Sequence, residues 1–134
     1  MKPGQVSFLL EGVYAASTKK RGRGVFTRLA IAAGTTIEIA PVIAMRAEDR
    51  LLLDQTLLHD YIFEWGENGS GCAMALGLIP MYNHSYKANC EYEMYFTKQA
   101  MTIKTVRNIK AGEELFINYN GEWNSEKAVW FPLS

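Results

Sequence analysis

The chain has 134 residues, of which 49% are hydrophobic, and its 14 Lys and Arg residues balance its 14 Asp and Glu residues. This length allows one globular domain but not two, and the hydrophobic content excludes a disordered chain. The absence of a basic excess argues against direct nucleic-acid binding, because phosphate contacts dominate that affinity.

Short strands separated by glycine-containing turns are predicted at both ends of the chain. Residues 6–13 and 24–28 have the composition of strands. Residues 31–39 and 109–117 echo each other, since each passes through an Ala-Gly turn into an alternating strand. Two copies are too few for a repeat protein, but they indicate a β-rich body built from similar corners.

One helix is predicted, over residues 48–59. Glu48 and Asp49 suit its first turn, where the helix dipole favours negative charge. Four leucines can share one face at helical spacing, namely Leu51, Leu52, Leu57 and Leu58. Residues 61–65 then alternate in the manner of a strand.

A loop, a hairpin and an aromatic flank are predicted in the second half of the chain. Residues 67–71 have the composition of a loop. Residues 91–97 and 101–106 form a hairpin across residues 98–100. Residues 123–134 contain bulky aromatic side chains without a clear period, so we expect an aromatic C-terminal flank.

The two cysteines, Cys72 and Cys90, are expected to be buried free thiols. A structural zinc site needs four ligands, and neither a Cys-x-x-Cys spacing nor more than two histidines is present. No secretory signal is visible, which disfavours a disulfide. The longest apolar stretches, such as residues 73–81, are too short for a membrane helix. We therefore expect an intracellular protein with no metal and no membrane partner.

Three short motifs carry the most specific information. They are Gly22-Arg23-Gly24-Val25-Phe26, then Asn83-His84-Ser85 with Asn89, then Glu114-Leu115 with Tyr119. Each alone has an ordinary structural explanation as a glycine turn, a polar turn or a half-buried strand. The ordered set resembles the SET domain, the fold of most protein lysine methyltransferases. The resemblance runs from about residue 5 to residue 123, and the sequence is similar to the short SET proteins of bacteria and large DNA viruses.

The resemblance implies a mainly β fold with short helices, the SET-domain (β-clip) fold. One SET domain would cover residues 1–134, with residues 123–134 as its flank. The C-terminal segment would thread under a surface loop in the knot-like manner of the family, which is rare among folds.

The activity implied by the resemblance is transfer of a methyl group from S-adenosylmethionine to the side-chain amine of a lysine on a protein. S-adenosylhomocysteine would be the product. The alternative is a catalytically inactive SET domain that binds proteins or peptides. A purely structural or oligomer-forming β protein would explain the turn echoes but not the three motifs.

The residue types suit this chemistry. Methyl transfer needs a neutral amine, whereas a free lysine with a pKa of about 10.4 is almost wholly charged at neutral pH. An apolar channel and a nearby sulfonium cation both lower that pKa. Tyrosines suit the lining of such a channel, because each supplies an apolar ring and one hydroxyl.

Three tyrosines are candidates for the lysine channel. By resemblance, Tyr119 is the catalytic tyrosine at the channel bottom, where its hydroxyl would orient the amine near the transferred methyl group. Tyr61 matches a second channel tyrosine, and the alternative is an ordinary tyrosine of an aromatic strand. Tyr82 either lines the channel or packs in the core.

The cofactor site implied by the resemblance contains Gly22, Arg23, Gly24, Asn83 and His84. The glycines let the backbone approach the cofactor, and Arg21 or Arg23 can pair with its carboxylate. Asn83 and His84 would contact it through amide and backbone groups. His84 is not assigned proton transfer, and Glu114 is expected to hold the motif together by hydrogen bonds.

Three departures from the family pattern change the expected site. Tyr86 stands where many SET enzymes carry a zinc-binding cysteine, so no zinc-bound flap is expected. Asn118 replaces the aspartate that often precedes the catalytic tyrosine, and residues 80–82 replace an Arg-Phe-x sequence that contributes a cofactor contact. In place of the zinc flap, aromatic side chains are expected to close the cofactor pocket, namely Trp123, Trp130 and Phe131.

The expected partner is a lysine-containing protein or peptide, histone-like or otherwise basic. Acidic residues gather near the motifs and could rim the lysine entrance, or they are ordinary solvated charges; they are Glu64, Glu67, Glu91, Glu93, Glu113, Glu114 and Glu122. A homodimer is left open. The expected location is intracellular, which in a prokaryote is the cytoplasm, and a nuclear or host-directed location is also left open.

Overall fold

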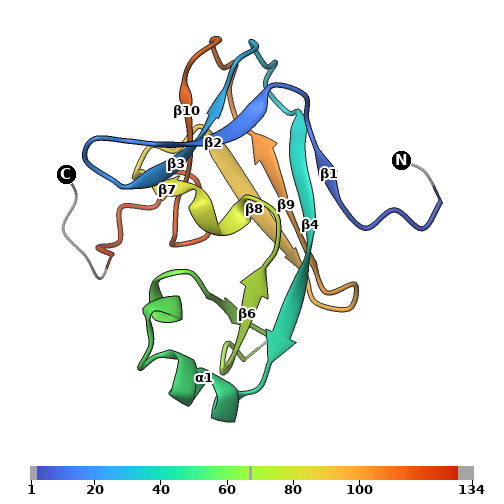
Figure 1. Cartoon of the computed structure of the whole chain (residues 1–134), viewed down its shortest axis with the longest axis vertical. Coiled ribbons are helices and arrows are strands. Elements are labelled where there is room, and N and C mark those ends of the chain that lie inside the picture. Colours follow the sequence, from blue (N-terminus) through green and yellow to red (C-terminus); the bar gives the residue numbers. More distant parts are fainter. Residues whose placement is uncertain (1–2, 67, 130–134) are drawn as a thin grey trace.

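The computed structural model, which describes residues 3–66 and 68–129, consists mainly of strands (Figure 1). The strands are β1 (Phe8–Leu9), β2 (Val13–Ser17), β3 (Arg23–Thr27), β4 (Thr36–Met45), β5 (Phe63–Trp65), β6 (Gly71–Ala75), β7 (Asn83–His84), β8 (Cys90–Tyr95), β9 (Ala100–Thr105) and β10 (Glu114–Ile117). Helical elements in the described part are α1 (Ala47–Leu53) and the 3-10 helices η1 (Leu57–Asp60) and η2 (Ile79–Met81). The predicted mainly β fold with short helices is confirmed, whereas the knot-like threading stays a prediction.

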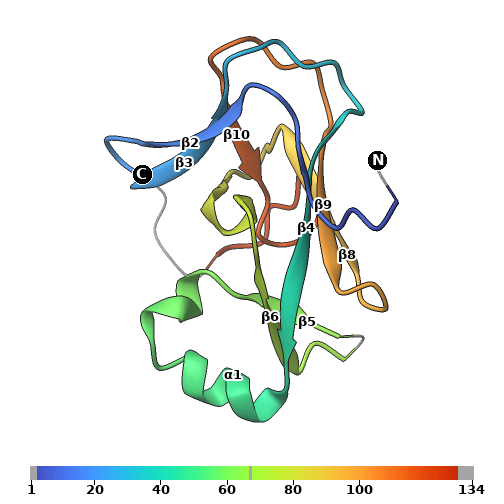
Figure 2. The same cartoon turned by 45° about the vertical axis from the view of Figure 1, so that its right-hand side comes forward.

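The strands form two sheets. The larger sheet has the order β5-β6-β4-β9-β8, with β1 paired to β4, and the smaller has the order β2-β3-β10-β7. Both views place β2, β3 and β10 at one end of the molecule and α1 at the other (Figure 2). β10 pairs antiparallel with β3 and parallel with β7. The three motifs, far apart in the sequence, therefore meet in one small sheet.

The two echoing segments lie next to each other. Ile31 and Ile109 form an isolated antiparallel bridge, with N–H···O distances of 2.9 and 2.8 Å. Gly34 and Gly112 turn the chain at φ values of +78° and +89°, which glycine adopts without a steric penalty. The sequence repeat thus marks two paired corners, which lead into β4 and β10.

The core takes side chains from both sheets. Val25, Ile37, Ile103, Leu115 and Ile117 are all 0% exposed. Cys72 and Cys90 are buried free thiols, as expected, and each lies on a strand of the larger sheet. The predicted hairpin is also confirmed, because β8 pairs with β9 from Cys90↔Thr105 to Tyr95↔Ala100.

Two predicted elements are wrong in extent. Residues 6–13 do not form one strand, because the chain turns between β1 and β2, where Gly12 has a φ of +92°. The predicted helix over residues 48–59 ends at Leu53, and η1 follows as a separate turn. As a result Tyr61 lies directly after η1, and β5 begins only at Phe63.

The predicted leucine face of this helix is not part of the core. Leu51, Leu52 and Leu57 are 68%, 68% and 75% exposed. Arg50 links α1 to the chain between β5 and β6 instead. Its guanidinium donates to the carbonyl oxygen of Gly69 at 2.7 Å and to Glu64 Oε1 of β5 at 3.2 Å. The interruption after Leu53 removes the continuous helical register on which the predicted leucine face depended.

Truncating a leucine should therefore have opposite consequences in β10 and in α1. Leu115→Ala should lower the free energy of unfolding by about 2–5 kcal/mol, because it opens a cavity in the core. Leu51→Ala, the matched exposed variant, should change it by no more than about 0.5 kcal/mol. Urea unfolding of both variants measures the difference, and similar losses would contradict this description of the core.

Candidate active site

Tyr119 follows β10 and is held at its backbone and at its hydroxyl. Its N–H donates to Nδ1 of His84 at 3.0 Å, and its carbonyl accepts from the Tyr92 hydroxyl at 3.4 Å. Its hydroxyl donates to the carbonyl oxygen of Tyr82 at 2.7 Å. Burial raises the pKa of Tyr119 to about 12, and the nearby Tyr61 adds to the rise. The hydroxyl is therefore protonated at neutral pH and positioned within a network.

A cavity of about 860 Å³ opens beside Tyr119. Its walls come from the segment between α1 and β6, from η2, from β8 and from the C-terminal segment. The aromatic residues among its lining are Tyr61, Phe63, Tyr82, Tyr92, Phe96 and Tyr119. All three tyrosines named from the sequence thus reach one cavity, and its volume lies in the range of ligand sites.

Tyr82 contributes to this cavity differently from the other tyrosines. The residue is 1% exposed, and its hydroxyl donates to Oε1 of Glu38 at 2.9 Å. The hydroxyl is therefore engaged in the core, while the backbone carbonyl of Tyr82 accepts from Tyr119. Of the two interpretations left open by the sequence, core packing describes the Tyr82 hydroxyl.

Tyr92 lines the cavity and was missed by the sequence reasoning. Burial raises its pKa to about 12, with a further contribution from the charge of Glu64. Tyr92 and Met94 alternate along β8, Phe96 follows directly after it, and all three line the cavity. That alternation is visible in the sequence, but it predicts only a shared face and not what the face borders.

Polar groups from the three motifs form a second cluster on the smaller sheet. Asn83 Nδ2 donates to Glu114 Oε2 at 2.8 Å and to the carbonyl oxygen of Arg23 at 3.2 Å. Arg21 pairs with Glu114 Oε1 at 2.8 Å. A Cβ atom at Gly24 would lie 2.6 Å from Glu114 Oε2 and 2.8 Å from Asn83 Nδ2, so a larger residue here would displace the side chains of this cluster. The prediction that Glu114 holds the motif together by hydrogen bonds is confirmed.

The sequence-predicted cofactor residues do not line the tyrosine cavity; they are Gly22, Arg23, Gly24, Asn83, His84 and Trp123. Tyr119 connects the two groups. Its backbone N–H donates to His84, and its hydroxyl donates to the carbonyl oxygen of Tyr82 in the cavity wall. The predicted site residues therefore form two neighbouring groups that share Tyr119.

Two buried asparagines support this arrangement. Asn89 donates to the carbonyl oxygen of Glu114 at 2.8 Å and accepts from the N–H of Phe116 at 2.7 Å, so it bonds β10 at two points. Asn118 donates to the carbonyl oxygen of Ser125 at 2.7 Å. The aspartate that the family often carries at this position could not donate that bond when ionised.

The described part of the C-terminal flank packs against the Asn83-His84 region. The N–H of Ala88 donates to the carbonyl oxygen of Trp123 at 3.0 Å, and the N–H of Val129 donates to the Tyr86 hydroxyl at 3.4 Å. Residues 127–129 line the tyrosine cavity. Trp123 is 40% exposed, and Trp130 and Phe131 lie outside the described residues.

Comparisons with known proteins agree with this geometry. Residues 22–120 match the family model described as the SET domain. The chain is 36% identical over 113 residues to the histone-lysine N-methyltransferase, H3 lysine-37 specific, of Schizosaccharomyces pombe, a match that covers 83% of this chain and 76% of the relative.

The fold is also similar to solved structures. One is a proposed histone methyltransferase of Plasmodium falciparum, with a TM-score of 0.61, 24% identity and coverage of 86% of this chain and 98% of that chain. Another is Polycomb Repressive Complex 2 of Chaetomium thermophilum bound to S-adenosylmethionine. The TM-score is 0.68 at 21% identity, and the match covers 82% of this chain and 15% of that chain.

The chain belongs to the SET domain family. It is a protein lysine methyltransferase that uses S-adenosylmethionine as the methyl donor. Among the residues that the structure describes, no helix is long and apolar enough to cross a membrane.

The bond between His84 and Tyr119 predicts a pH dependence of stability. A backbone N–H can only donate, so Nδ1 of His84 must be unprotonated, and burial lowers the pKa of this histidine. In the unfolded chain the pKa is about 6.5. Because the unfolded state then binds the proton more readily, the free energy of unfolding should fall as pH drops below about 6.5 toward the lowered native pKa.

His84→Asn, which keeps an acceptor near Tyr119, should flatten this part of the profile. Urea unfolding of both proteins between about pH 5 and 8 measures the two slopes. Parallel profiles would show that His84 does not carry the dependence.

Proposed function

We propose that the cavity beside Tyr119 receives the substrate lysine and that the cluster around Asn83 holds S-adenosylmethionine, so that the methyl group is transferred next to Tyr119. The observation that carries this proposal is the position of Tyr119 between the two groups of residues. His84 binds its backbone from the motif side, and its hydroxyl is held at Tyr82 in the cavity wall.

The donor set around Asn83 fits the cofactor. A Cβ atom at Gly22 would meet nothing within 4 Å, so the backbone there is open to a ligand. Arg21 is paired with Glu114, whereas the exposed Arg23 is available for the cofactor's carboxylate. The side chain of Asn83 donates through Nδ2, and its Oδ1 can accept from the cofactor's ammonium group.

The cavity supplies two conditions for methyl transfer. Its aromatic lining disfavours a charged ammonium, so the substrate lysine is more readily neutral there. The Tyr119 hydroxyl, protonated and fixed to Tyr82, can accept an N–H of the amine and direct its lone pair. S-adenosylmethionine supplies an electrophilic methyl group on a sulfonium and leaves as S-adenosylhomocysteine; no metal is needed for this role.

We further propose that residues 1–134 act as one SET unit inside the cell, with residues 123–134 as its flank. Support comes from the bonds of residues 123 and 129 to the chain around Tyr86. In this proposal residues 127–129 form a wall of the lysine cavity. The flank would also close the cofactor pocket, as expected from the sequence. Residues 130–134 lie outside the described part of this flank.

The proposed substrate is a basic protein segment such as a histone tail. The Schizosaccharomyces pombe relative is named as a histone H3 enzyme, and three carboxylates at the cavity, Asp54, Asp60 and Glu64, outnumber the cations Arg50 and Lys127. This rim differs from the one expected from the sequence. Of the expected carboxylates that the structure describes, only Glu64 lines the cavity. Glu67 lies outside the described residues.

Two of the carboxylates expected at the rim, Glu113 and Glu114, do not line the cavity. Glu113 pairs with Arg107 at 3.0 Å and accepts from the N–H of Lys110 at 2.6 Å. Glu114 is engaged by Arg21 and Asn83. These side chains close a turn and join the motifs, so they do not rim the lysine entrance.

Removing only the hydroxyl of Tyr119 tests the proposed mechanism. Tyr119→Phe keeps the ring, so the fold and cofactor affinity should survive. Turnover at saturating cofactor should fall by one or more powers of ten, each equal to about 1.4 kcal/mol, because the amine loses an orienting contact in the transition state. Tyr14→Phe is the matched control, since Tyr14 is 39% exposed on β2. Wild-type turnover in Tyr119→Phe would refute this role.

The acidic rim predicts a charge preference among substrates. At low ionic strength, lysine peptides with basic flanks should be methylated faster than peptides with acidic flanks, and salt should reduce the difference. Initial rates of methyl transfer to a matched peptide pair, measured at two salt concentrations, provide the test. Equal rates for both peptides at low salt would remove the electrostatic argument for a basic substrate.

A further inference from the structure

Glu38 is a carboxylate in the core. The residue is 2% exposed, and its neighbour Ile37 is 0% exposed. Two successive side chains of β4 can both point inward because the pairing with β9 shifts register between Thr36 and Glu38. Such a bulge re-aims the side chains of a strand, and here it turns an ionisable group inward.

Both oxygens of this carboxylate bind the segment that precedes the Asn83-His84 motif. Oε1 accepts from the Tyr82 hydroxyl at 2.9 Å, and Oε2 accepts from the N–H of Leu78 at 2.7 Å. A Cβ atom at Gly77 would collide with Oε2, and Gly77 has a φ of +67°. The backbone around residues 77–82 is therefore shaped to receive the carboxylate.

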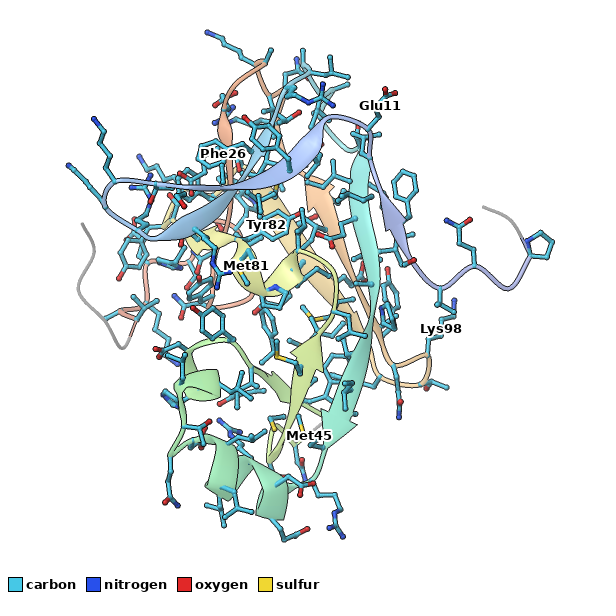
Figure 3. The ribbon with its side chains drawn as sticks, viewed as in Figure 1. Glu11, Phe26, Met45, Met81, Tyr82 and Lys98 are labelled. Carbon is cyan, nitrogen blue, oxygen red and sulfur yellow. The ribbon has the colours of Figure 1, made fainter. Side chains whose placement is uncertain are left out.

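The same segment carries the acceptor of the catalytic hydroxyl. η2 begins directly after Leu78, and Tyr82 follows η2 near the middle of the molecule (Figure 3). Glu38 accepts hydrogen bonds from both ends of this segment, Leu78 and Tyr82. The carbonyl of Tyr82 in turn accepts from the Tyr119 hydroxyl at 2.7 Å. A continuous series of hydrogen bonds and one short segment thus joins Glu38 to Tyr119.

A carboxylate at this place has a desolvation cost that its two hydrogen bonds offset. Burial raises the pKa of Glu38, while the bonds from Leu78 and Tyr82 lower it, so the site opposes ionisation by desolvation and favours it by hydrogen bonding. An apolar side chain could not hold the segment at two points.

We propose that Glu38 is a positioning residue for methyl transfer: by holding Leu78 and Tyr82 it fixes the carbonyl that orients the Tyr119 hydroxyl. This inference rests on the proposed catalytic role of Tyr119. Glu38 touches neither lysine nor cofactor in this role and acts through Tyr82.

A double-mutant cycle tests the inference. Glu38→Gln keeps the shape but replaces one of the two acceptor oxygens by an NH2 group, which cannot accept a hydrogen bond. It should lower kcat roughly tenfold while the KM for cofactor changes less than about twofold. In the Tyr119→Phe background the same substitution should have no further effect on kcat, because the hydroxyl that it positions is gone. Glu113→Gln is the matched control, because that carboxylate also binds a backbone N–H but lies outside the site.

The outcomes separate this inference from the proposed function. An equal loss of kcat from Glu38→Gln in both backgrounds, or no loss in either, would overturn the positioning role. Full turnover in Tyr119→Phe alone would instead refute the catalytic role of Tyr119, on which the inference depends. All rates are measured below the unfolding transition of each variant.

A second variant covers the case in which Glu38→Gln does not fold. Tyr82→Phe removes one of the two bonds but leaves the Leu78 bond and the Tyr82 carbonyl in place. It should lower kcat by a smaller factor, and again only when Tyr119 is present. A loss of the same size in both backgrounds would overturn the inference.

Discussion

The parallel pairing of β10 with β7 is the constraint on which the site depends. It sets Phe116 opposite Asn83 and Ile117 opposite His84, so the residues that follow β10 emerge beside the motif of β7. Asn89 bonds the backbone of β10 from one side, and Glu114 joins Asn83 to Arg21 from the other. Without this pairing, neither His84 nor Tyr82 would be within reach of Tyr119.

Side-chain hydrogen bonds to backbone provide much of the precision around this pairing. Short β7, with two residues, and η2, with three, form few bonds of their own. Asn89 bonds the backbone of β10, which pairs with β7, and Asn118 bonds the carbonyl oxygen of Ser125; both residues are 1% exposed. Polar groups buried in this way must be satisfied, so their partners are strongly specified. The arrangement gives a small enzyme a defined site without long secondary-structure elements.

The described part of the C-terminal flank is held by hydrogen bonds from single side chains. The hydroxyl of Tyr86 accepts from the backbone N–H of Val129 at 3.4 Å. Asn118 binds the carbonyl of Ser125, and Asn120 binds that of Lys127 at 2.6 Å. Hydrogen bonds from single side chains therefore guide the segment along the molecule, and its last described residues become part of the cavity wall.

The sequence by itself determined the family, the β-rich class, the paired Ala-Gly corners and the motifs that contain Tyr119, Asn83 and Glu114. These features depend on local turn chemistry and on motifs whose residue types are restricted. The extent of α1 and the exposure of its leucines were decided by the tertiary structure, because helical periodicity alone does not say whether another element covers a face. The orientation of Tyr82, the place of Tyr92 and the inward turn of Glu38 were likewise decided there. A strand pattern defines two faces, but only packing and the bulge in β4 determine which face meets the cavity and which meets the core.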